Sequence, residues 1–305
     1  MNKYLKDLVF VVSGGRTGTQ FLGDRLSTAI TDSFSVHDPD ILSAYISRIT
    51  GRIRVFGLWN MTVGKAIGTS GVRSVGHRII TGEMDRQTGL ARLYKLRAKY
   101  HESINESLII ESNSQWFYVC DELKEIWPHA RVIIVVRDPR TWIRSWLNKG
   151  IRWRAFDPVR LLPPGRLTPR KTGDLELASR WRSFGTFERL AWEWSFVYGR
   201  LQAHVERNGN ARIFRFEDLF GSATKDAMNE LVAFAASHGG RGYDFEVPDD
   251  FTKTVCNASH GAAPNWNEWS PEQAWLVDAL CGSLMVKYGY GQEPSWKKKV
   301  EQYLL

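Results

Sequence analysis

The sequence has few cysteines and no long hydrophobic run. It contains three cysteines in 305 residues, and they lie far apart, at Cys120, Cys256 and Cys281. An odd number of cysteines at such spacing forms neither a disulfide framework nor a metal-binding motif. The first apolar run covers only residues 8–12, and no later run approaches the length of a membrane span. We therefore expect a cytoplasmic protein with reduced cysteines and no membrane span.

Acidic residues are outnumbered by basic ones. The chain has 33 Asp and Glu residues against 41 Lys and Arg residues, which gives a formal net charge of +8. This excess favours an anionic ligand. The basic residues are dispersed apart from a cluster in residues 152–171, and no nucleic-acid-binding motif is present. We therefore expect no nucleic acid partner.

The length and the apolar content fit one domain. Hydrophobic residues make up 43% of the chain, enough for a sizeable core, and 305 residues suit a single α/β unit. We expect one domain over residues 1–305. Residues 151–173 are rich in Pro, Gly, Arg and Lys and show no periodicity, so we interpret them as a long, mobile, basic loop. The sequence gives no indication of an oligomeric state.

The most informative segment is SGGRTGTQF, residues 13–21. It follows the apolar run and precedes a predicted helix, and this order of strand, glycine-rich turn and helix N-terminus is typical of an anion-binding site. The glycines allow left-handed backbone angles and a close approach to a ligand. Two threonines add hydroxyl donors, and Arg16 adds a charge with several donors. An ordinary strand-to-helix turn is the alternative interpretation.

The turn differs from the phosphate-binding loop of nucleoside-triphosphate enzymes. That loop ends in Gly-Lys-Ser/Thr, where the lysine contacts the phosphates and the hydroxyl holds magnesium. Here the corresponding residues are Gly18, Thr19 and Gln20, and the cation, Arg16, lies two residues before the glycine. The difference argues against a magnesium-dependent kinase or NTPase.

A second segment, residues 131–145, joins a buried strand to polar residues. Its first part, RVIIVV, is a continuous apolar run rich in β-branched residues, typical of a strand in a parallel sheet. Asp138 and Pro139 then form a favoured helix start. Arg137 therefore stands at the carboxyl end of a strand, where ligands bind in α/β sheets, and Ser145 lies two helical turns later. A structural ion pair of Arg137 is the alternative.

Together the two segments resemble the sulfotransferase superfamily, whose donor is 3′-phosphoadenosine 5′-phosphosulfate (PAPS), with a pattern closest to its bacterial and carbohydrate-type members. Residues 214–219, FRFEDL, and residues 269–290 are also similar to the family. The resemblance implies that the turn grips the 5′-phosphosulfate and that Arg137 and Ser145 grip the 3′-phosphate. The implied donor-binding residues are Gly15, Arg16, Thr17, Gly18, Thr19, Gln20, Arg137 and Ser145.

The resemblance also points to catalytic residues. Many members have a lysine that assists at the sulfonate, but Ser112 stands in its place here. Its neighbour Glu111 is one candidate for the base that takes the proton of the acceptor hydroxyl. His37 and Asp38 are the other two, because many carbohydrate sulfotransferases have an acidic residue before a proline at that place. Arg16 is expected to stabilise the charge that grows on the leaving group.

Alternating strands and helices predict a P-loop-like, three-layer α/β/α fold with a central, mostly parallel sheet. Strands are expected at residues 8–12, 35–39, 108–111, 131–136 and 211–216. Helices are expected at residues 18–31, 88–101, 114–127, 174–207, 223–238 and 271–288, and another from Pro139. Residues 54–59 and 72–80 are interpreted as strands or lid segments.

The expected reaction is in-line transfer of a sulfuryl group from PAPS to an acceptor hydroxyl. No metal is expected, because Arg16 and the helix end supply the positive field. A saccharide or glycolipid acceptor is preferred, since the turns look closer to carbohydrate sulfotransferases than to those acting on phenols and steroids. Two alternatives stay open: a P-loop small-molecule kinase, and a non-catalytic nucleotide-binding relative, which the missing lysine at position 112 would fit.

Overall fold

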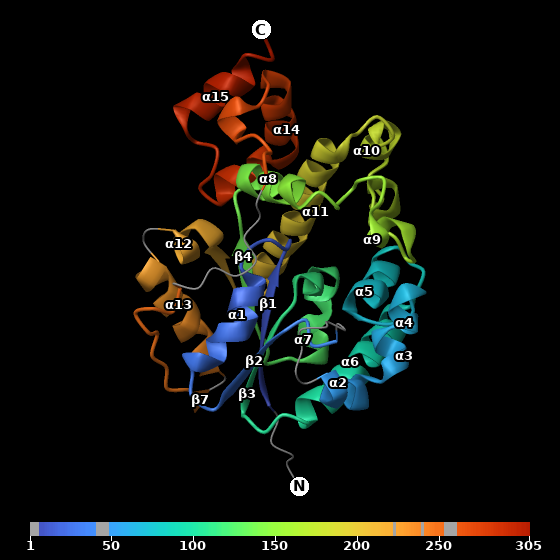
Figure 1. Ribbon diagram of the computed structural model, residues 1–305, viewed down its shortest axis with the longest axis vertical. Coiled ribbons are helices and arrows are strands. Elements are labelled where there is room, and N and C mark those ends of the chain that lie inside the picture. Colours follow the sequence, from blue (N-terminus) through green and yellow to red (C-terminus); the bar gives the residue numbers. More distant parts are fainter. Residues whose placement is uncertain (1–5, 41–48, 222–223, 239–240, 253–260) are drawn as a thin grey trace.

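Five parallel strands form the centre of the molecule, in the order β2-β3-β1-β4-β5 (Figure 1). The computed structural model describes residues 6–40, 49–221, 224–238, 241–252 and 261–305. The strands are β1 Asp7–Ser13, β2 Ser33–His37, β3 Leu108–Ser112, β4 Arg131–Val136 and β5 Ala211–Arg215. They agree with the five strands expected from the sequence, within a few residues at their ends.

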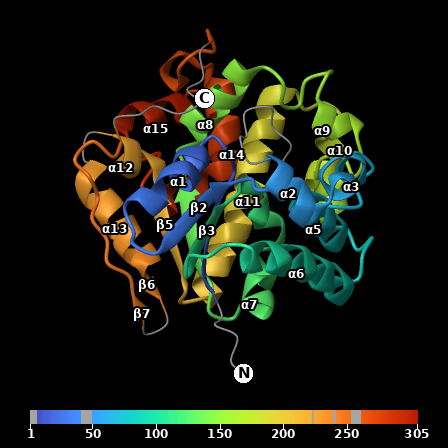
Figure 2. The same cartoon turned by 60° about the horizontal axis from the view of Figure 1, so that its bottom comes forward.

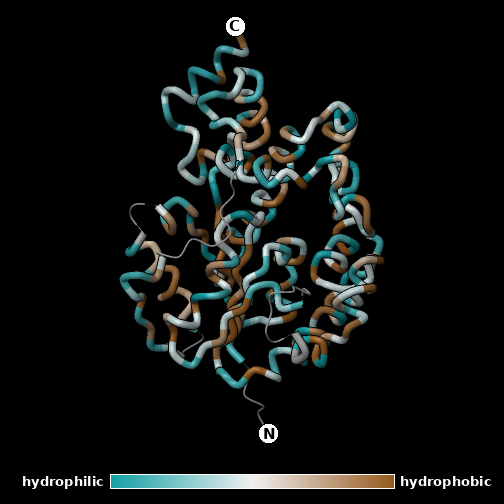
Figure 3. The backbone as a smooth tube through the Cα atoms, in the orientation of Figure 1, coloured by the Kyte–Doolittle hydropathy of each residue, from teal (hydrophilic) through white to brown (hydrophobic). Residues whose placement is uncertain are grey.

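The central strands bury side chains on both faces of the sheet. In β1, Leu8, Phe10 and Val12 pack into one hydrophobic cluster, whereas Val9 and Val11 pack into the other. This alternation follows from the two-residue period of a strand. Figure 3 shows these strands as a brown, hydrophobic band through the middle of the chain. A continuous apolar run therefore corresponds to a strand covered on both sides.

Helices cover both faces, so the predicted three-layer α/β/α architecture is confirmed. One cluster includes side chains of η2 Ser114–Glu122, α7 Leu123–Ile126, α8 Pro139–Lys149, α11 Thr186–Arg207 and α14 Pro271–Lys287. The other includes those of α1 Thr19–Arg25, α12 Phe216–Phe220 and α13 Thr224–Ala236. The helix α1 lies very close to β2, because a Cβ atom on Gly23 would come within 2.8 Å of the Cβ atom of His37.

The chain changes sides between β1 and β4, which are neighbours in the sheet. After β1 it continues into α1 on one face, and after β4 it continues into α8 on the other face. Adjacent parallel strands whose connections leave in opposite directions open a crevice at their carboxyl ends, and ligands of α/β proteins bind in such crevices. The glycine-rich turn and Arg137 both stand at this crevice.

Residues 49–102 form helices joined by turns, so strands at 54–59 and 72–80 are wrong, and the alternative of lid segments stays a prediction. The helices are α2 Ile49–Phe56, α3 Leu58–Met61, α4 Val63–Ala66, α5 Val72–Ile80 and α6 Arg86–Glu102. In α5, Val72 and Val75 are buried three residues apart, which is the helical period and not the alternation of a strand. The β-branched residues favoured a strand locally, but packing against η2 decides the structure.

The expected helix at 174–207 is interrupted. The chain forms α10 Leu175–Arg180, then a turn, and resumes as α11 after Gly185, whose backbone is extended. The turn places the ring of Trp181 edge-on to Trp153, with centroids 5.2 Å apart. Within the expected loop at 151–173, two short helices form, α9 Pro158–Leu161 and η3 Pro169–Thr172. The mobility of this loop stays a prediction.

Other differences are small. The expected helix at 114–127 begins as the 3₁₀ segment η2 and becomes α-helical only in α7. Four elements were not expected: β6 Ser237–His238, β7 Arg241–Gly242, η4 Trp266–Glu268 and α15 Pro294–Glu301. Cys120 and Cys281 are buried free thiols, and Cys256 lies outside the described residues. Among the helices that the structure describes, none is long and apolar enough to cross a membrane.

Candidate functional site

A cavity of about 1100 Å³ opens at the carboxyl edge of the sheet. Its walls come mainly from the segments that follow β1, β2, β3 and β4, together with residues 144–166. Ligand pockets of about 300–1,000 Å³ hold drug-sized molecules. The cavity is therefore large enough for a nucleotide and part of a second molecule.

The glycine-rich turn forms one wall of the cavity. Gly15, Arg16 and Gly18 all have left-handed backbone angles, with φ values of 78°, 58° and 77°. Gly18 is the N-cap of α1, and a Cβ atom at this position would lie 2.5 Å from the Phe220 ring. The indole nitrogen of Trp142 donates to the Gly15 carbonyl at 2.7 Å and fixes the turn against α8. Only glycine fits position 18 without strain.

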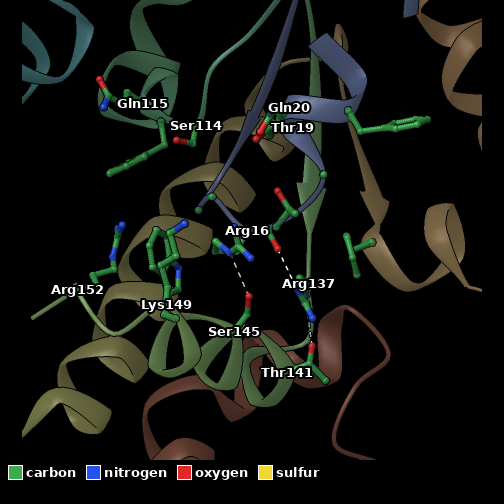
Figure 4. A pocket seen from close by; sticks show the side chains of 18 of the residues that line it. Arg16, Thr19, Gln20, Ser114, Gln115, Arg137, Thr141, Ser145, Lys149 and Arg152 are labelled. Atoms are coloured by element: carbon green, nitrogen blue, oxygen red, sulfur yellow. Dashed lines mark hydrogen bonds between the residues drawn. The ribbon is translucent and has the colours of Figure 1, made fainter. Parts of the chain in front are cut away.

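The expected donor-binding residues line one region of the cavity, which we call the turn end: residues 14–20, Arg137 and Ser145. The Arg16 Nε atom donates to Ser145 Oγ at 3.1 Å. Arg137 donates from Nη1 to the Arg16 carbonyl at 2.9 Å and from Nε to Thr141 Oγ1 at 3.0 Å. Figure 4 shows these side chains converging between the turn and α8. The structure thus brings together all eight residues named from the sequence.

The turn end is rich in positive charge. Arg137 stacks on the Phe216 ring at 4.4 Å, and within the described residues it pairs with no carboxylate. Burial lowers the pKa of Arg137 and of Arg16, yet a guanidinium stays protonated in proteins. The hydroxyl oxygen of Thr17 is buried and has no hydrogen-bond partner in the described part of the chain. Such a set of cations and polar atoms is suited to an anion.

Asp38 is the acidic residue that lines the cavity next to the turn. It has φ of 42°, and its backbone N–H donates to the Ser112 carbonyl at 3.1 Å. Burial, reinforced by the charge of Asp40, raises the pKa of Asp38 to about 7. A carboxylate poised near neutral pH has the pKa of an effective general base.

His37 stands beside Asp38 and also lines the cavity. Its Nε2 atom lies 3.3 Å from Asp38 Oδ2, and its Nδ1 atom is buried without a partner among the described residues. Burial lowers the pKa of His37, so the ring is neutral at pH 7. A neutral imidazole in contact with the carboxylate orients it without neutralising its charge.

Glu111, the third candidate base, does not line the cavity. It is 1% exposed, and its two oxygens lie 3.2 Å from Arg97 Nη2 and 3.3 Å from His101 Nε2. Arg97 also reaches Asp40 at 3.5 Å. The carboxylate is thus part of a buried ion-pair network with Arg97, His101 and Asp40, outside the cavity wall.

Ser112 occupies the position where many sulfotransferases have a lysine, and it makes a structural contact there. Its hydroxyl is fully buried and donates to the Thr19 carbonyl at 2.7 Å. This bond ties the end of β3 to the first turn of α1. Ser112 therefore supplies no charge to the cavity, whose wall contains other cations, among them Lys149 and Arg152 (Figure 4).

Several lining residues were not identified from the sequence. Thr141 and Lys149 lie four residues before and after Ser145, on the same face of α8. Helical periodicity therefore predicts that they line the cavity with it. Ser114 and Gln115 directly follow β3 at the sheet edge, which is also a readable signal. The arginines at 73, 152 and 166 carry no such signal, because loops and distant helices bring them to the cavity.

These three arginines form a second region of the cavity, which we call the loop end: Arg73, Arg152 and Arg166. Arg152 makes an ion pair with Glu193, and Arg166 donates to both oxygens of Asp157. Arg73 instead donates to the backbone carbonyls of Val159, at 3.2 Å, and Gly165. The loop end is therefore held by carboxylates and carbonyls that come from the chain itself.

The fold and the cavity define an α/β/α protein with a cation-lined pocket at the carboxyl edge of a parallel sheet. Residues 87–221, which contain Arg137 and Ser145, match the family model of a sulfotransferase domain. This part of the chain is therefore similar to a sulfotransferase domain. The match does not include the glycine-rich turn.

The structure is similar to solved sulfotransferases. A sulfotransferase from Mycobacterium avium shares 13% identity over 93% of this chain and 77% of that chain, with a TM-score of 0.51, and so has the same fold. A sulfotransferase from Alicyclobacillus acidocaldarius shares 14% identity over 96% and 99% of the two chains, with a TM-score of 0.42. The sulfotransferase domain of the Synechococcus PCC 7002 olefin synthase shares 13% identity over 100% and 97%, with a TM-score of 0.42. No curated protein matches the sequence.

Proposed function

We propose that the protein transfers a sulfuryl group from PAPS to an acceptor hydroxyl. The observation that carries the proposal is the turn end, where Arg16, Arg137 and Ser145 meet in one cavity and Arg137 has no carboxylate partner among the described residues. Arg137 is half-buried, and a guanidinium that is partly removed from water is stabilised by a ligand that supplies negative charge. A nucleotide with phosphate groups at both its 3′ and 5′ positions has that charge.

The backbone of the turn and Thr17 are proposed to hold the 5′-phosphosulfate, and Arg137, Thr141 and Ser145 the 3′-phosphate. Thr17 supports this assignment because its buried hydroxyl has an unused hydrogen-bonding capacity. The Arg16 side chain bonds to Ser145, a residue assigned to the other end of the nucleotide. We propose that Arg16 exchanges this bond for one to the sulfonate when the donor binds.

In the proposed reaction, an oxygen lone pair of the acceptor forms the new S–O bond while the S–O bond to the 5′-phosphate breaks. The electron pair of the broken bond stays on the phosphate oxygen, so negative charge grows next to the turn. Arg16 and the backbone N–H groups of the turn stabilise that charge. The leaving product is adenosine 3′,5′-bisphosphate, and the positive field of the arginines makes a metal ion unnecessary.

Asp38 is proposed as the base that takes the acceptor proton, in preference to His37 and Glu111. It lines the cavity, has a pKa of about 7, and has one buried oxygen without a partner among the described residues. His37 orients it, and Glu111 lies outside the cavity wall. The proton therefore moves from the acceptor oxygen to a carboxylate oxygen of Asp38.

The acceptor is proposed to enter at the loop end and to be a saccharide or glycolipid. Phe117, Tyr118 and Trp146 also line the cavity, and aromatic rings can pack against a sugar. We also propose a cytoplasmic location, because the two described cysteines are free thiols, as expected in a reducing compartment.

The proposal is tested by incubating the protein with PAPS and pooled saccharides and glycolipids in the presence of EDTA. We expect adenosine 3′,5′-bisphosphate to form only when an acceptor is present, together with an acceptor that has gained one sulfuryl group by mass spectrometry. ATP with magnesium serves as the matched donor. Phosphorylation of the acceptors from ATP, with no transfer from PAPS, would overturn the proposal in favour of a kinase.

A further inference from the structure

The positive charge of the chain is concentrated in two segments. Residues 49–82 contain five Lys and Arg residues and no Asp or Glu. Residues 139–173 contain nine Lys and Arg residues and one acidic residue. The remaining residues have 27 basic and 32 acidic side chains, so that part of the protein is acidic. The single acid in the two segments, Asp157, is buried and bonded to Arg166. By sequence the basic excess belongs to these two segments, although Lys65, Arg140 and Arg152 pair with acids outside them.

The fold brings the two segments side by side. Arg73 in α5 donates to the backbone carbonyls of Val159 and Gly165. A Cβ atom on Gly68 would lie 2.9 Å from the backbone of Pro163, so the two chain segments touch. Figures 1 and 2 show α3, α5 and α9 on the same side of the molecule in both views. Residues that are 86 and 92 positions apart in sequence thus come into contact.

This surface also exposes large apolar side chains. In α3 and α4, Trp59, Val63 and Ile67 follow each other at four-residue intervals and are 60%, 43% and 49% exposed. In the facing segment, Phe156 is 79% exposed and Leu161 is 60% exposed. We call the surface the basic-apolar face, defined by Leu58, Trp59, Val63, Ile67, Phe156, Leu161, Leu162, Arg154 and Arg160. Exposed apolar groups gathered in one place mark an interaction surface.

The combination of charge and apolar groups identifies the partner. A polyanionic glycan or a nucleic acid would use the arginines but would leave the leucine, valine and isoleucine side chains in water. An anionic bilayer uses both, since its headgroups attract basic residues and its acyl boundary accepts apolar and aromatic side chains. Cytoplasmic membrane surfaces are anionic, which agrees with the charge of this face.

We propose that the basic-apolar face docks on the surface of an anionic lipid bilayer. Ile151 and Val159, in the same loop segment, and Arg73 line the cavity, so its loop end opens beside the docked surface. A membrane-borne acceptor would then reach the cavity without leaving the bilayer surface. This last step rests on the proposed function, whereas docking itself does not.

The test is flotation of the full chain with vesicles of phosphatidylcholine alone or with phosphatidylglycerol added. We expect binding to the anionic vesicles and little to the neutral ones. Arg154→Ala with Arg160→Ala should weaken vesicle binding at least tenfold, and so should Trp59→Ser with Leu161→Ser. The matched controls are Lys297→Ala with Lys298→Ala and Tyr303→Ser with Leu304→Ser, whose exposed side chains lie near the C-terminus, and they should bind as the unchanged protein does.

Three results would overturn the docking proposal. The first is equal binding to neutral and anionic vesicles. The second is a loss of binding in the control variants as large as that in the test variants. The third is binding to soluble dextran sulfate in place of vesicles, with Trp59→Ser and Leu161→Ser leaving that binding unchanged. Titration of all variants with adenosine 3′,5′-bisphosphate separates this proposal from the proposed function. If the protein binds the bisphosphate but no vesicles, only the docking proposal is rejected. If it binds vesicles but not the bisphosphate, only the proposed donor is rejected. Thermal unfolding verifies that each variant is folded.

Discussion

The turn end and the loop end of the cavity are both rich in arginine, but they hold it differently. At the loop end, Arg152 and Arg166 are paired with Glu193 and Asp157, whereas Arg73 is held by backbone carbonyls. At the turn end, Arg137 is held by a carbonyl, a hydroxyl and an aromatic ring, with no carboxylate partner in the described structure. Paired arginines mainly shape a cavity, whereas an unpaired arginine keeps its charge available to a ligand. The comparison therefore supports the proposal that the anionic donor binds at the turn end.

The largest expected effect comes from Asp38, which stands beside the turn end. Asp38→Asn removes the proposed base, and we expect kcat to fall by roughly 10²- to 10⁴-fold. Since the pKa of Asp38 is about 7, the rate of the unchanged enzyme should rise as pH increases through 7, and the variant should lose that rise. The check is a pH–rate profile of both proteins. An unchanged profile in the variant would assign the base to another residue.

Asp38 also links activity to stability. Its pKa is higher in the folded protein than the ordinary value of 3.8, so the folded state binds more protons between these values. Stability should therefore decrease as pH rises from about 4 to about 7 through this group, and Asp38→Asn should remove that decrease. Urea unfolding of both proteins at a series of pH values measures this dependence of the unfolding free energy on pH. A carboxylate that stabilised the fold on ionisation would give the opposite trend.

The paired arrangement at the loop end is tested by Glu193→Gln. This change leaves Arg152 buried without its carboxylate, and breaking such a pair costs roughly 3–5 kcal/mol of unfolding free energy. Because Arg152 holds the pKa of Glu193 below its usual range, against the effect of burial, the stabilisation should be lost as pH falls below the ordinary value of about 4.5. Bisphosphate affinity should change little, so a large loss of affinity in folded protein would contradict the comparison.

Arg16→Ala separates turnover from binding at the turn end. Loss of one group that stabilises a growing oxyanion costs about 10²- to 10³-fold in kcat, and we expect a smaller loss of donor affinity. Steady-state kinetics measures kcat, and bisphosphate titration of the same preparation measures the donor-site affinity. Equal losses in both would mean that Arg16 contributes only to ground-state binding.

Arg137→Ala should affect binding more than turnover. It removes a charged donor to a phosphate, worth about 1.5–3 kcal/mol or roughly 10- to 150-fold in affinity. Titration calorimetry with adenosine 3′,5′-bisphosphate measures this loss. Arg131→Ala is the matched control, because Arg131 begins the same strand at its other end and bonds to the Phe234 carbonyl. Undiminished affinity in Arg137→Ala would remove this residue from the 3′-phosphate site.

Ser145→Ala should give the smallest effect. A neutral hydroxyl contributes about 1 kcal/mol to a hydrogen bond, so bisphosphate affinity should fall roughly fivefold. The Arg16 side chain also loses its bond to this hydroxyl, and kcat should remain within a few-fold of the original. Ser145→Thr, which keeps a hydroxyl, is the control. A kcat loss as large as that of Arg16→Ala would show that Ser145 positions Arg16 for catalysis.

The turn end could be predicted from the sequence because its residues directly follow buried strands. The apolar runs before Gly14 and Arg137 identified parallel strands, and the carboxyl ends of neighbouring parallel strands meet at one edge. Ser145 was identified from the superfamily resemblance, eight residues after Arg137 on the following helix. The superfamily resemblance supplied the roles, which the geometry alone does not assign.

The loop end could not be predicted in this way. Arg73, Arg152 and Arg166 reach the cavity from segments whose positions depend on tertiary packing. The β-branched residues of α5 favoured a strand, although its contacts with η2 and α6 make it a helix. Glu111 was a candidate base from its place near the end of β3, but its carboxylate pairs with Arg97 and His101, which arrive from the distant helix α6.

The central claim is that one nucleotide bridges the turn and the start of α8 through phosphate groups at its two ends. The most direct test is calorimetry in EDTA with adenosine 3′,5′-bisphosphate, adenosine 5′-monophosphate and adenosine 3′-monophosphate. The account predicts that the bisphosphate binds at least tenfold more tightly than either monophosphate, and that Arg137→Ala reduces its affinity to that of the 5′-monophosphate. Equal affinities for all three nucleotides, or binding that requires magnesium, would contradict it.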